Sequence, residues 1–266
     1  MNCRLQAALI ATISTIALTQ VASAADLPRK APAAAPPPAP TYIWTGCYAG
    51  DNVGGAWSKQ TGDFAAVPAV LQSPGTIDLS DSSVIAGVHL GCNYQFNPGF
   101  VVGVEGDWSW TDLNASGSAP NIFSPTGLPL TNGGVNMSMN TKWIASLRAR
   151  LGWVFMPQAM IYATGGAAWT KTDYAAFDAA TSGNGYTAVS FNNTKTGWVV
   201  GGGAEYMLTP NWIVRAEYLY YQFDGASALG NNLTPGAGGP TGLFATFNWN
   251  DLKVNEVRVG ISYKFF

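Results

Sequence analysis

From residue 43 to the end of the chain, apolar side chains recur at every second position, in segments rich in β-branched and aromatic residues. Gly, Asn, Pro and Asp separate these segments. A period of two is typical of β-strands, because successive side chains point to opposite faces of a sheet. No run of 18 apolar residues follows the first 24 residues, which excludes a protein that spans a membrane with helices. We therefore expect an all-β fold.

The alternating segments predict eight strands. Their ranges are 43–57, 82–96, 100–112, 139–155, 160–172, 195–208, 212–223 and 251–266. Each is longer than the five or six residues that are usual in globular sheets, and this length suits a tilted crossing of a bilayer.

The connections between the predicted strands alternate between short and long. The three short ones are Asn97-Pro98-Gly99, Met156-Pro157-Gln158-Ala159 and Thr209-Pro210-Asn211. The other four, 58–81, 113–138, 173–194 and 224–250, are rich in Gly, Ser, Thr, Asn and Pro, and we expect them to be loops. Tight turns at one end and long polar loops at the other are typical of an outer-membrane barrel. The sequence therefore predicts an eight-stranded antiparallel up-and-down transmembrane β-barrel, with short turns and both termini in the periplasm.

Alternation also assigns the two faces of each predicted strand. In the segment 139–155, Trp143, Leu147 and Leu151 share one side, while Arg148 and Arg150 share the other. We assign the apolar side to lipid and the charged side to the lumen, as in other narrow barrels. The charged residues expected in the lumen are Glu105, Asp107, Glu205, Glu217, Glu256, Arg148, Arg150, Arg215, Arg258 and Lys264. Balanced ion pairs would fill the lumen, and a permanent aqueous pore is the alternative.

Aromatic residues support this topology independently. The outer ring is expected to comprise Trp108, Trp110, Trp143, Trp169, Trp198 and Tyr220. The periplasmic ring is expected to comprise Phe96, Phe100, Phe155, Tyr206, Trp212, Tyr263 and Phe265. Two such rings mark the interfaces of a bilayer, and a soluble lipocalin-like barrel, the alternative, has no use for them.

The first 24 residues have the organisation of a cleaved secretory signal. A basic Arg4 precedes an apolar stretch, and small residues follow at Ala22 and Ala24. We predict cleavage between Ala24 and Ala25, because the apolar stretch is too short for the alternative, a membrane anchor. Residues 25–41 are rich in Pro and Ala and are predicted to form a periplasmic tail before a barrel domain at 42–266.

Several function classes find no support in the composition. Charged residues make up 11% of the chain, with 13 Lys and Arg against 15 Asp and Glu, so a surface for nucleic acid is not expected. The one histidine, His89, is expected in the lumen, and no spacing indicates a catalytic triad or a metal site. The run 201–203 of three glycines fits close packing in a curved strand better than phosphate binding. We expect no enzymatic activity, no metal and no cofactor.

Two cysteines remain after the predicted cleavage, Cys47 and Cys92. Antiparallel pairing of their strands places them at similar height on the lipid face, and opposed positions can meet disulfide geometry in an oxidising compartment. The two interpretations are a disulfide and two small apolar side chains that face acyl chains.

Four segments carry a family resemblance: Tyr42–Gly50 (YIWTGCYAG), Ser146–Gly152 (SLRARLG), Ala216–Tyr221 (AEYLYY) and Val257–Phe266 (VRVGISYKFF). Together they resemble the small outer-membrane β-barrel proteins of alphaproteobacteria, a porin family of surface-antigen and haem-binding barrels related in fold to OmpA-like transmembrane domains. The resemblance covers roughly 42–266. It implies outer-membrane localisation, abundance, a part in envelope integrity, contact with a host or other surface and, in some relatives, haemin binding.

The resemblance also implies roles for single residues. The assembly machinery reads a terminal aromatic residue in this family, which assigns that signal to Tyr263, Phe265 and Phe266, with Phe265 in the family's position. Family members usually carry aromatic residues at the positions of Cys47 and Cys92, and a glycine at that of Asp51.

Two classes of function follow. One is a structural barrel of the bacterial surface with a largely plugged lumen and exposed loops, and the other is a small-solute porin or a haem-binding receptor. Haem usually needs His or Tyr ligands. The predicted loops contain no histidine, and Tyr174 and Tyr186 are the only obvious candidates there, so we favour the structural class. The expected partners are outer-membrane lipid, lipopolysaccharide and the barrel assembly machinery. The sequence does not define the oligomeric state.

Overall fold

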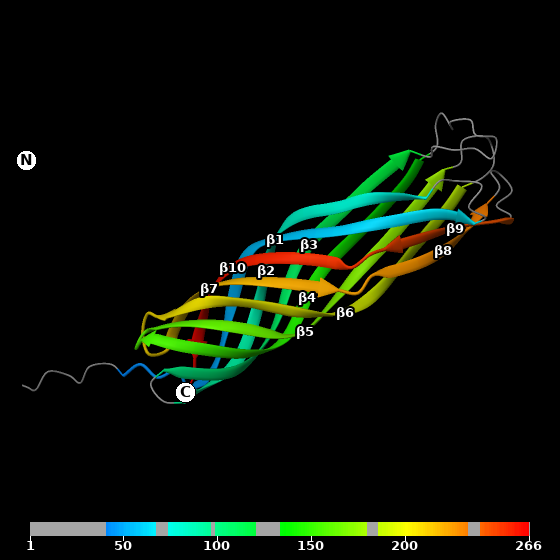
Figure 1. Cartoon of the computed structure of the whole chain (residues 1–266). Helices are drawn as coiled ribbons and strands as arrows, with labels where there is room; N and C mark the ends of the chain where they lie inside the picture. The colour runs from blue at the N-terminus through cyan, green and yellow to red at the C-terminus, as the bar shows by residue number, and fades with distance from the viewer. Residues whose placement is uncertain are drawn as a thin grey trace, which may run out of the picture. The chain divides into compact units, whose positions relative to one another are not determined.

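The computed structural model describes residues 41–67, 74–96, 99–120, 134–179, 186–233 and 240–265. These residues form ten strands of one antiparallel sheet (Figure 1). The strands are β1 (Gly46–Val67), β2 (Gly75–Phe96), β3 (Phe100–Pro120), β4 (Gly134–Met156), β5 (Ala159–Ala179), β6 (Tyr186–Met207), β7 (Trp212–Phe223), β8 (Ala226–Leu233), β9 (Pro240–Trp249) and β10 (Leu252–Lys264). Within the described ranges, no helix is long and apolar enough to cross a membrane.

Eight of the ten strands close into a ring. Strands β1 to β6 each pair with the next strand along the chain, β7 pairs with β10, and β10 pairs with β1. When paired residues are followed once around this ring from Ala49, the path returns to β1 at Lys59, ten residues further on. Eight strands with this stagger tilt by about 40° and leave an interior just wide enough for side chains. The predicted eight-stranded up-and-down barrel is therefore confirmed.

The strands continue well beyond their predicted ends on the side of the long connections. β1 runs to Val67, β3 runs to Pro120 and β6 begins at Tyr186, all within segments that we expected to be loops. That expectation was wrong. Many Ser, Asn and Gly residues of these segments occupy exposed positions of strands, and the residues that alternate with them are buried. At the short turns the predicted ends lie within a residue or two of the observed ones, except that β1 begins at Gly46 rather than at residue 43.

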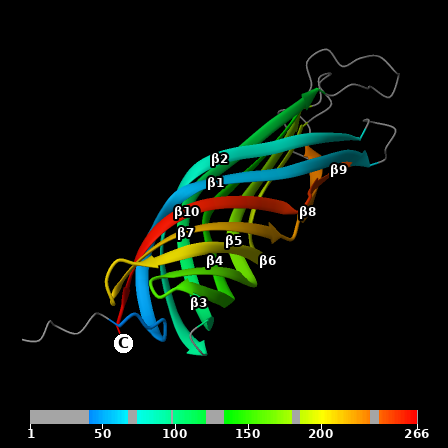
Figure 2. The ribbon, with the colours of Figure 1, turned by 60° about the vertical axis from the view of Figure 1, so that its left-hand side comes forward.

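The segment 224–250, expected to be a loop, contains a further hairpin of β8 and β9. β8 pairs with β9, and β9 pairs with the outer part of β1, so this hairpin extends the barrel wall. Lys195 donates a hydrogen bond from Nζ to the carbonyl oxygen of Gly225 and spans the break between β7 and β8. Figure 2 shows β8 and β9 at the end of the barrel opposite the C-terminus. We call the part of the barrel beyond the outer aromatic ring the outer extension.

The burial pattern inverts between the two parts of the barrel. Near the C-terminal end, Leu147 and Leu151 of β4 are more than half exposed, whereas Arg148 between them is 1% exposed. In the outer extension, Met137 of the same strand is buried and its neighbour Asn136 is exposed. The lower part therefore has the pattern of a barrel in lipid, and the outer extension has the apolar interior and polar surface of a water-soluble sheet.

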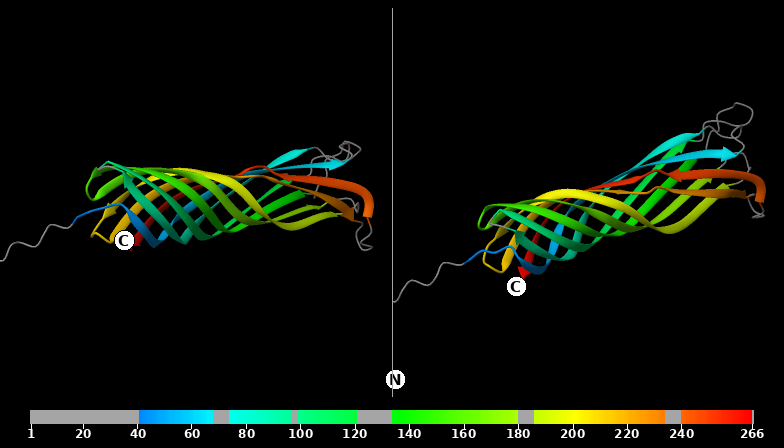
Figure 3. Two further views of the ribbon diagram at one scale, coloured as in Figure 1. Left: turned by 90° about the horizontal axis from the view of Figure 1, so that it is seen from below. Right: turned by 60° about the horizontal axis from the view of Figure 1, so that its bottom comes forward.

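Both predicted aromatic rings lie on the outer surface. Every residue of the periplasmic ring is at least 40% exposed, and Trp108, Trp110 and Trp198 of the outer ring are 39–56% exposed. The indole rings of Trp108 and Trp143 stack with their centroids 4.3 Å apart. Figure 3 shows the barrel from below, with the C-terminus at the end of the short turns. The two rings delimit the surface expected to face lipid.

Candidate functional site in the barrel lumen

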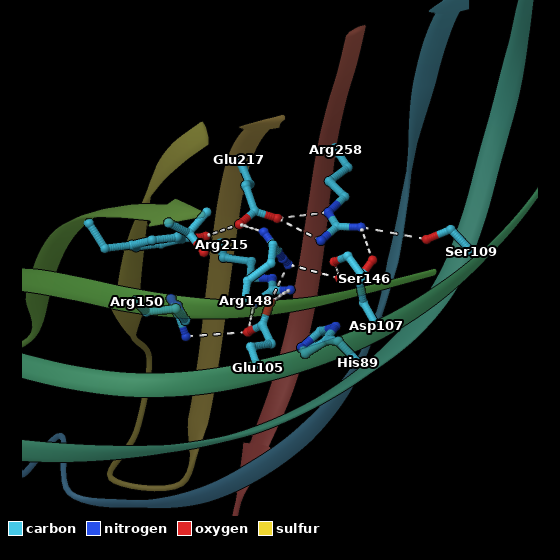
Figure 4. Close-up of polar contacts among 12 residues, drawn as sticks. His89, Glu105, Asp107, Ser109, Ser146, Arg148, Arg150, Arg215, Glu217 and Arg258 are labelled. Carbon is cyan, nitrogen blue, oxygen red and sulfur yellow. Dashed lines mark hydrogen bonds and ion pairs between the residues drawn. The ribbon is translucent and has the colours of Figure 1, made fainter. Parts of the chain in front are cut away.

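Charged side chains from five strands meet in the middle of the lumen (Figure 4). Glu105 of β3 is their hub. Its carboxylate accepts hydrogen bonds from Arg148 at 2.5 Å and from both terminal nitrogens of Arg215 at 2.6 and 3.0 Å. Arg148 lies on the neighbouring strand β4, but Arg215 lies on β7, so the second contact crosses the lumen. Glu105 is fully buried, and the low dielectric of such a site strengthens these contacts.

A second carboxylate, Glu217 of β7, continues the cluster. It accepts hydrogen bonds from Arg148 at 2.8 Å, from the Nε of Arg258 at 2.8 Å and from the Tyr162 hydroxyl at 2.9 Å. Asp107 lies 3.2 Å from both Arg148 and Arg258. Each arginine therefore bridges two or more carboxylates, and the fork of the guanidinium makes such bridging possible.

Arg150 forms the periplasmic edge of the cluster. Its guanidinium contacts Glu205 and the hydroxyl of Tyr48, and it stacks 3.9 Å above the ring of Tyr162. The Tyr48 hydroxyl in turn donates to Glu105 at 2.7 Å. Neither tyrosine was among the residues that we expected in the lumen, although Tyr48 follows Cys47, which the alternation assigns to the lipid face.

Two of the ten charged residues assigned to the lumen depart from the expected pairing. Glu256 is fully buried, but its ion pair with Arg258 is long, at 3.6 Å. Lys264 lies at the periplasmic end, where it donates to the carbonyl oxygen of Ile43. The cluster thus holds five carboxyl groups and four arginines, rather than the expected five acids against five bases. Lys264 lies outside the cluster because it is the last residue of β10, six residues beyond Arg258.

Apolar layers lie on both sides of the charged cluster. The periplasmic layer comprises Trp44, Val101, Met160, Tyr162, Met207 and Ile213. The layer in the outer extension is larger and includes Leu79, Leu113, Met137, Tyr174, Phe223, Phe247 and Trp249. We did not predict the second layer, because most of these residues fall in segments that were expected to be loops. The alternation of Val135, Met137 and Met139 with Asn and Ser was the available signal.

The remaining candidate residues occupy simple structural positions. His89 is buried and lies 2.7 Å from the Ser262 hydroxyl. Cys47 and Cys92 are directly paired on the outer face of β1 and β2 and form a disulfide. Tyr263 and Phe265 are 40% and 49% exposed. Ala24, Ala25, Phe266 and nearly all of the predicted tail lie outside the described residues.

The candidate haem ligands are not in loops. Tyr174 is 1% exposed in the core of the outer extension, where it stacks against Phe191. Tyr186 begins β6 and stacks on Phe177. Across the described ranges, no group of three or more His, Cys, Asp and Glu residues could hold a metal ion. The glycines of 201–203 pack tightly, since a Cβ on Gly203 would lie 2.4 Å from the carbonyl oxygen of Ala216.

Comparisons with known proteins agree with this architecture. A family model described as outer membrane protein beta-barrel domain matches residues 30–265. The 31 kDa outer-membrane immunogenic protein of Brucella melitensis is 32% identical over 266 residues, which cover 98% of this chain and 100% of that protein. The 25 kDa outer-membrane immunogenic protein of Brucella abortus is 31% identical over 265 residues, which cover 98% of this chain and 99% of that protein.

Solved structures give a likeness of fold alone. The crystal structure of the outer membrane protein OprG from Pseudomonas aeruginosa matches 84% of this chain and 98% of its own chain, with a TM-score of 0.49 and 16% identity. The match to the family model spans most of the chain, and the relatives match over their full length. The chain therefore belongs to the outer membrane protein β-barrel family and crosses the outer membrane with its strands.

Proposed function

We propose that this protein is a structural component of the bacterial surface, a closed barrel that carries a folded extracellular extension rather than a solute channel. The observation that supports this proposal most directly is the filled lumen. Glu105, Arg148 and Arg258 at its centre are each at most 1% exposed, and apolar layers lie on both sides of them. A hydrated path would have to displace all three layers.

The outer extension supports the same proposal. Its polar outer surface and apolar core form a folded wall that continues the barrel beyond the outer aromatic ring. Relatives of this chain are named outer-membrane immunogenic proteins, and these names support the proposal of a place at the bacterial surface. We further propose that lipid and lipopolysaccharide surround the barrel and that the assembly machinery recognises its C-terminal aromatic residues. We also propose that the protein has no enzymatic activity.

Electrical recording of the purified protein in planar lipid bilayers tests the closed lumen. We expect no stable conductance from the folded protein, whereas a general porin inserted under the same conditions gives steady open steps. A large, steady open state of the unaltered protein would contradict the proposal and favour the small-solute porin. Heat-modifiable migration on a denaturing gel verifies that the recorded sample is folded.

Titration with haemin tests the receptor alternative. Because Tyr174 is buried and His89 lies inside the lumen, we expect no shift of the Soret band when the folded protein is added. A saturable shift with one haemin per barrel would favour the receptor.

A further inference from the structure

Among the described residues, the outer surface between the two aromatic rings carries one Asp, Glu, Lys or Arg side chain, Asp51 of β1. Asp51 is exposed, and its paired neighbours Val88 and Ile261 are 44% and 41% exposed apolar residues. All arginines of this zone point into the lumen. A carboxylate therefore faces acyl chains, where ionisable groups are costly and usually pair with another polar group.

The register of the strands gives the depth of Asp51. Along a strand tilted by about 40°, each residue rises about 2.5 Å along the barrel axis. Trp108 of the outer ring pairs with Val88, which pairs with Asp51, and this register places Trp108 about 6 Å above Asp51 in height. Tyr263 of the periplasmic ring pairs with Ala49, which places Asp51 roughly 8 Å above that ring. Asp51 is thus too deep for its short side chain to reach the headgroups.

The surface beside Asp51 is hollowed. A shallow hollow of about 700 Å³ spans β1, β2 and β3, and Ala49, Asp51, Gly106 and Trp108 are among its lining residues. Ala49 and Gly106 are small residues on the outward positions of their strands, and small residues allow close approach of membrane proteins. An acyl chain could fill this hollow, but it offers no hydrogen bond to a carboxyl group.

We infer that this face is an interface between two copies of the chain, which pair their Asp51 carboxyl groups across a two-fold axis. Both copies insert in the membrane with the same polarity, so an axis along the membrane normal brings the two Asp51 residues to the same depth. Two carboxyl groups that share protons satisfy each other's donors and acceptors, and no other molecule is then required. A complementary lysine or arginine is not available on the described outward surface of a second copy between the rings.

The association is measured by counting subunits in lipid vesicles. The folded full chain, with one dye on its N-terminal tail, is diluted over a wide range of protein-to-lipid ratios, and bleaching steps are counted in single vesicles. We expect dimers that dissociate on dilution. Asp51→Val should weaken the association at least tenfold, and Asp51→Asn, whose amide can still pair with its copy, should retain most of it.

The matched control is Ala149→Val. Ala149 is exposed on β4, three strands away, and the register places it within about 1 Å of the depth of Asp51. This substitution adds the same side chain at the same depth and should leave the association unchanged. Heat-modifiable migration verifies that each variant is folded, and a valine on a lipid-facing position is compatible with folding.

Cross-linking locates the interface with Asp51 intact. Val53→Cys, two residues from Asp51 on the same face, should form an intermolecular disulfide in vesicles, and Ala149→Cys should not. Monomers at every protein-to-lipid ratio would overturn the inference. So would dimers that Asp51→Val leaves unchanged, or cross-linking that is equal at positions 53 and 149.

Discussion

Two carboxyl groups of the lumen are equally buried but differ in their partners, and this difference gives a quantitative prediction. Glu105 and Glu256 are both fully buried. Glu105 accepts hydrogen bonds from Arg148, Arg215 and Tyr48 at 2.5–3.0 Å, whereas the ion pair of Glu256 with Arg258 measures 3.6 Å. We compare Glu105→Gln with Glu256→Gln.

Glu105→Gln preserves shape but removes the negative charge and turns one oxygen into a donor that faces arginine N–H groups. Loss of one partner from a buried ion pair costs about 3–5 kcal/mol in the free energy of unfolding, because the other charge stays buried without compensation. This corresponds to roughly a thousandfold in the folding equilibrium constant. Glu256→Gln should cost about 1 kcal/mol or less, since it breaks no short hydrogen bond to a charged group.

Equilibrium unfolding in urea, with the barrel in lipid or detergent micelles and tryptophan fluorescence as the signal, measures both free energies. Identical slopes for the variants and the parent would verify that unfolding exposes the same surface. Equal losses for the two variants, or a larger loss for Glu256→Gln, would refute the reasoning that partners rather than burial decide the contribution of each carboxyl group.

Three further predictions follow from the structure. Arg148→Ala or Arg215→Ala should lower the unfolding free energy by about 3–5 kcal/mol and leave the bilayer conductance nearly unchanged, because the apolar layers persist; a new steady conductance would contradict this. Phe247→Ala should cost about 3–5 kcal/mol, because a fully buried ring leaves a cavity in the outer extension, whereas Phe244→Ala on the outer surface of the same strand should cost far less; urea unfolding compares the two. Alkylation of thiols with a large reagent should retard the denatured protein only after reduction, because Cys47 and Cys92 are bonded; identical migration with and without reduction would count against the disulfide.

The sequence predicted the membrane-spanning part of the fold well. In the middle of β4, β7 and β10, apolar residues alternate with charged or small ones, and in a narrow barrel the charged side has to face the lumen. The cluster around Glu105 could be predicted as a group but not in its pairing. Glu105 and Arg148 are opposed on adjacent strands, while the contact between Glu105 and Arg215 crosses the lumen and depends on the diameter and stagger of the barrel.

The outer extension could not be predicted from the same pattern without a further rule. Above the outer ring the polar residues face water and the apolar residues face inward, so the alternation in 134–141 has the opposite meaning from that in 145–155. A register shift between Thr141 and Trp143 of β4 separates the two zones. Such a bulge changes which alternate positions point outward, and nothing local in Thr141-Lys142-Trp143 marks it.

The central claim is a barrel whose outward face is apolar in the membrane and polar beyond it, and a scan along β4 tests it most directly. Single cysteines at successive positions from 135 to 155 carry a spin label in lipid vesicles, and collisions with oxygen and with a water-soluble nickel complex report lipid and water. The account predicts oxygen contact at odd positions from 145 to 155, nickel contact at even positions from 136 to 142, and neither at Met137 or Arg148. Oxygen contact at Arg148 together with protection of Leu147 and Leu151, or one unbroken alternation across Trp143, would contradict it.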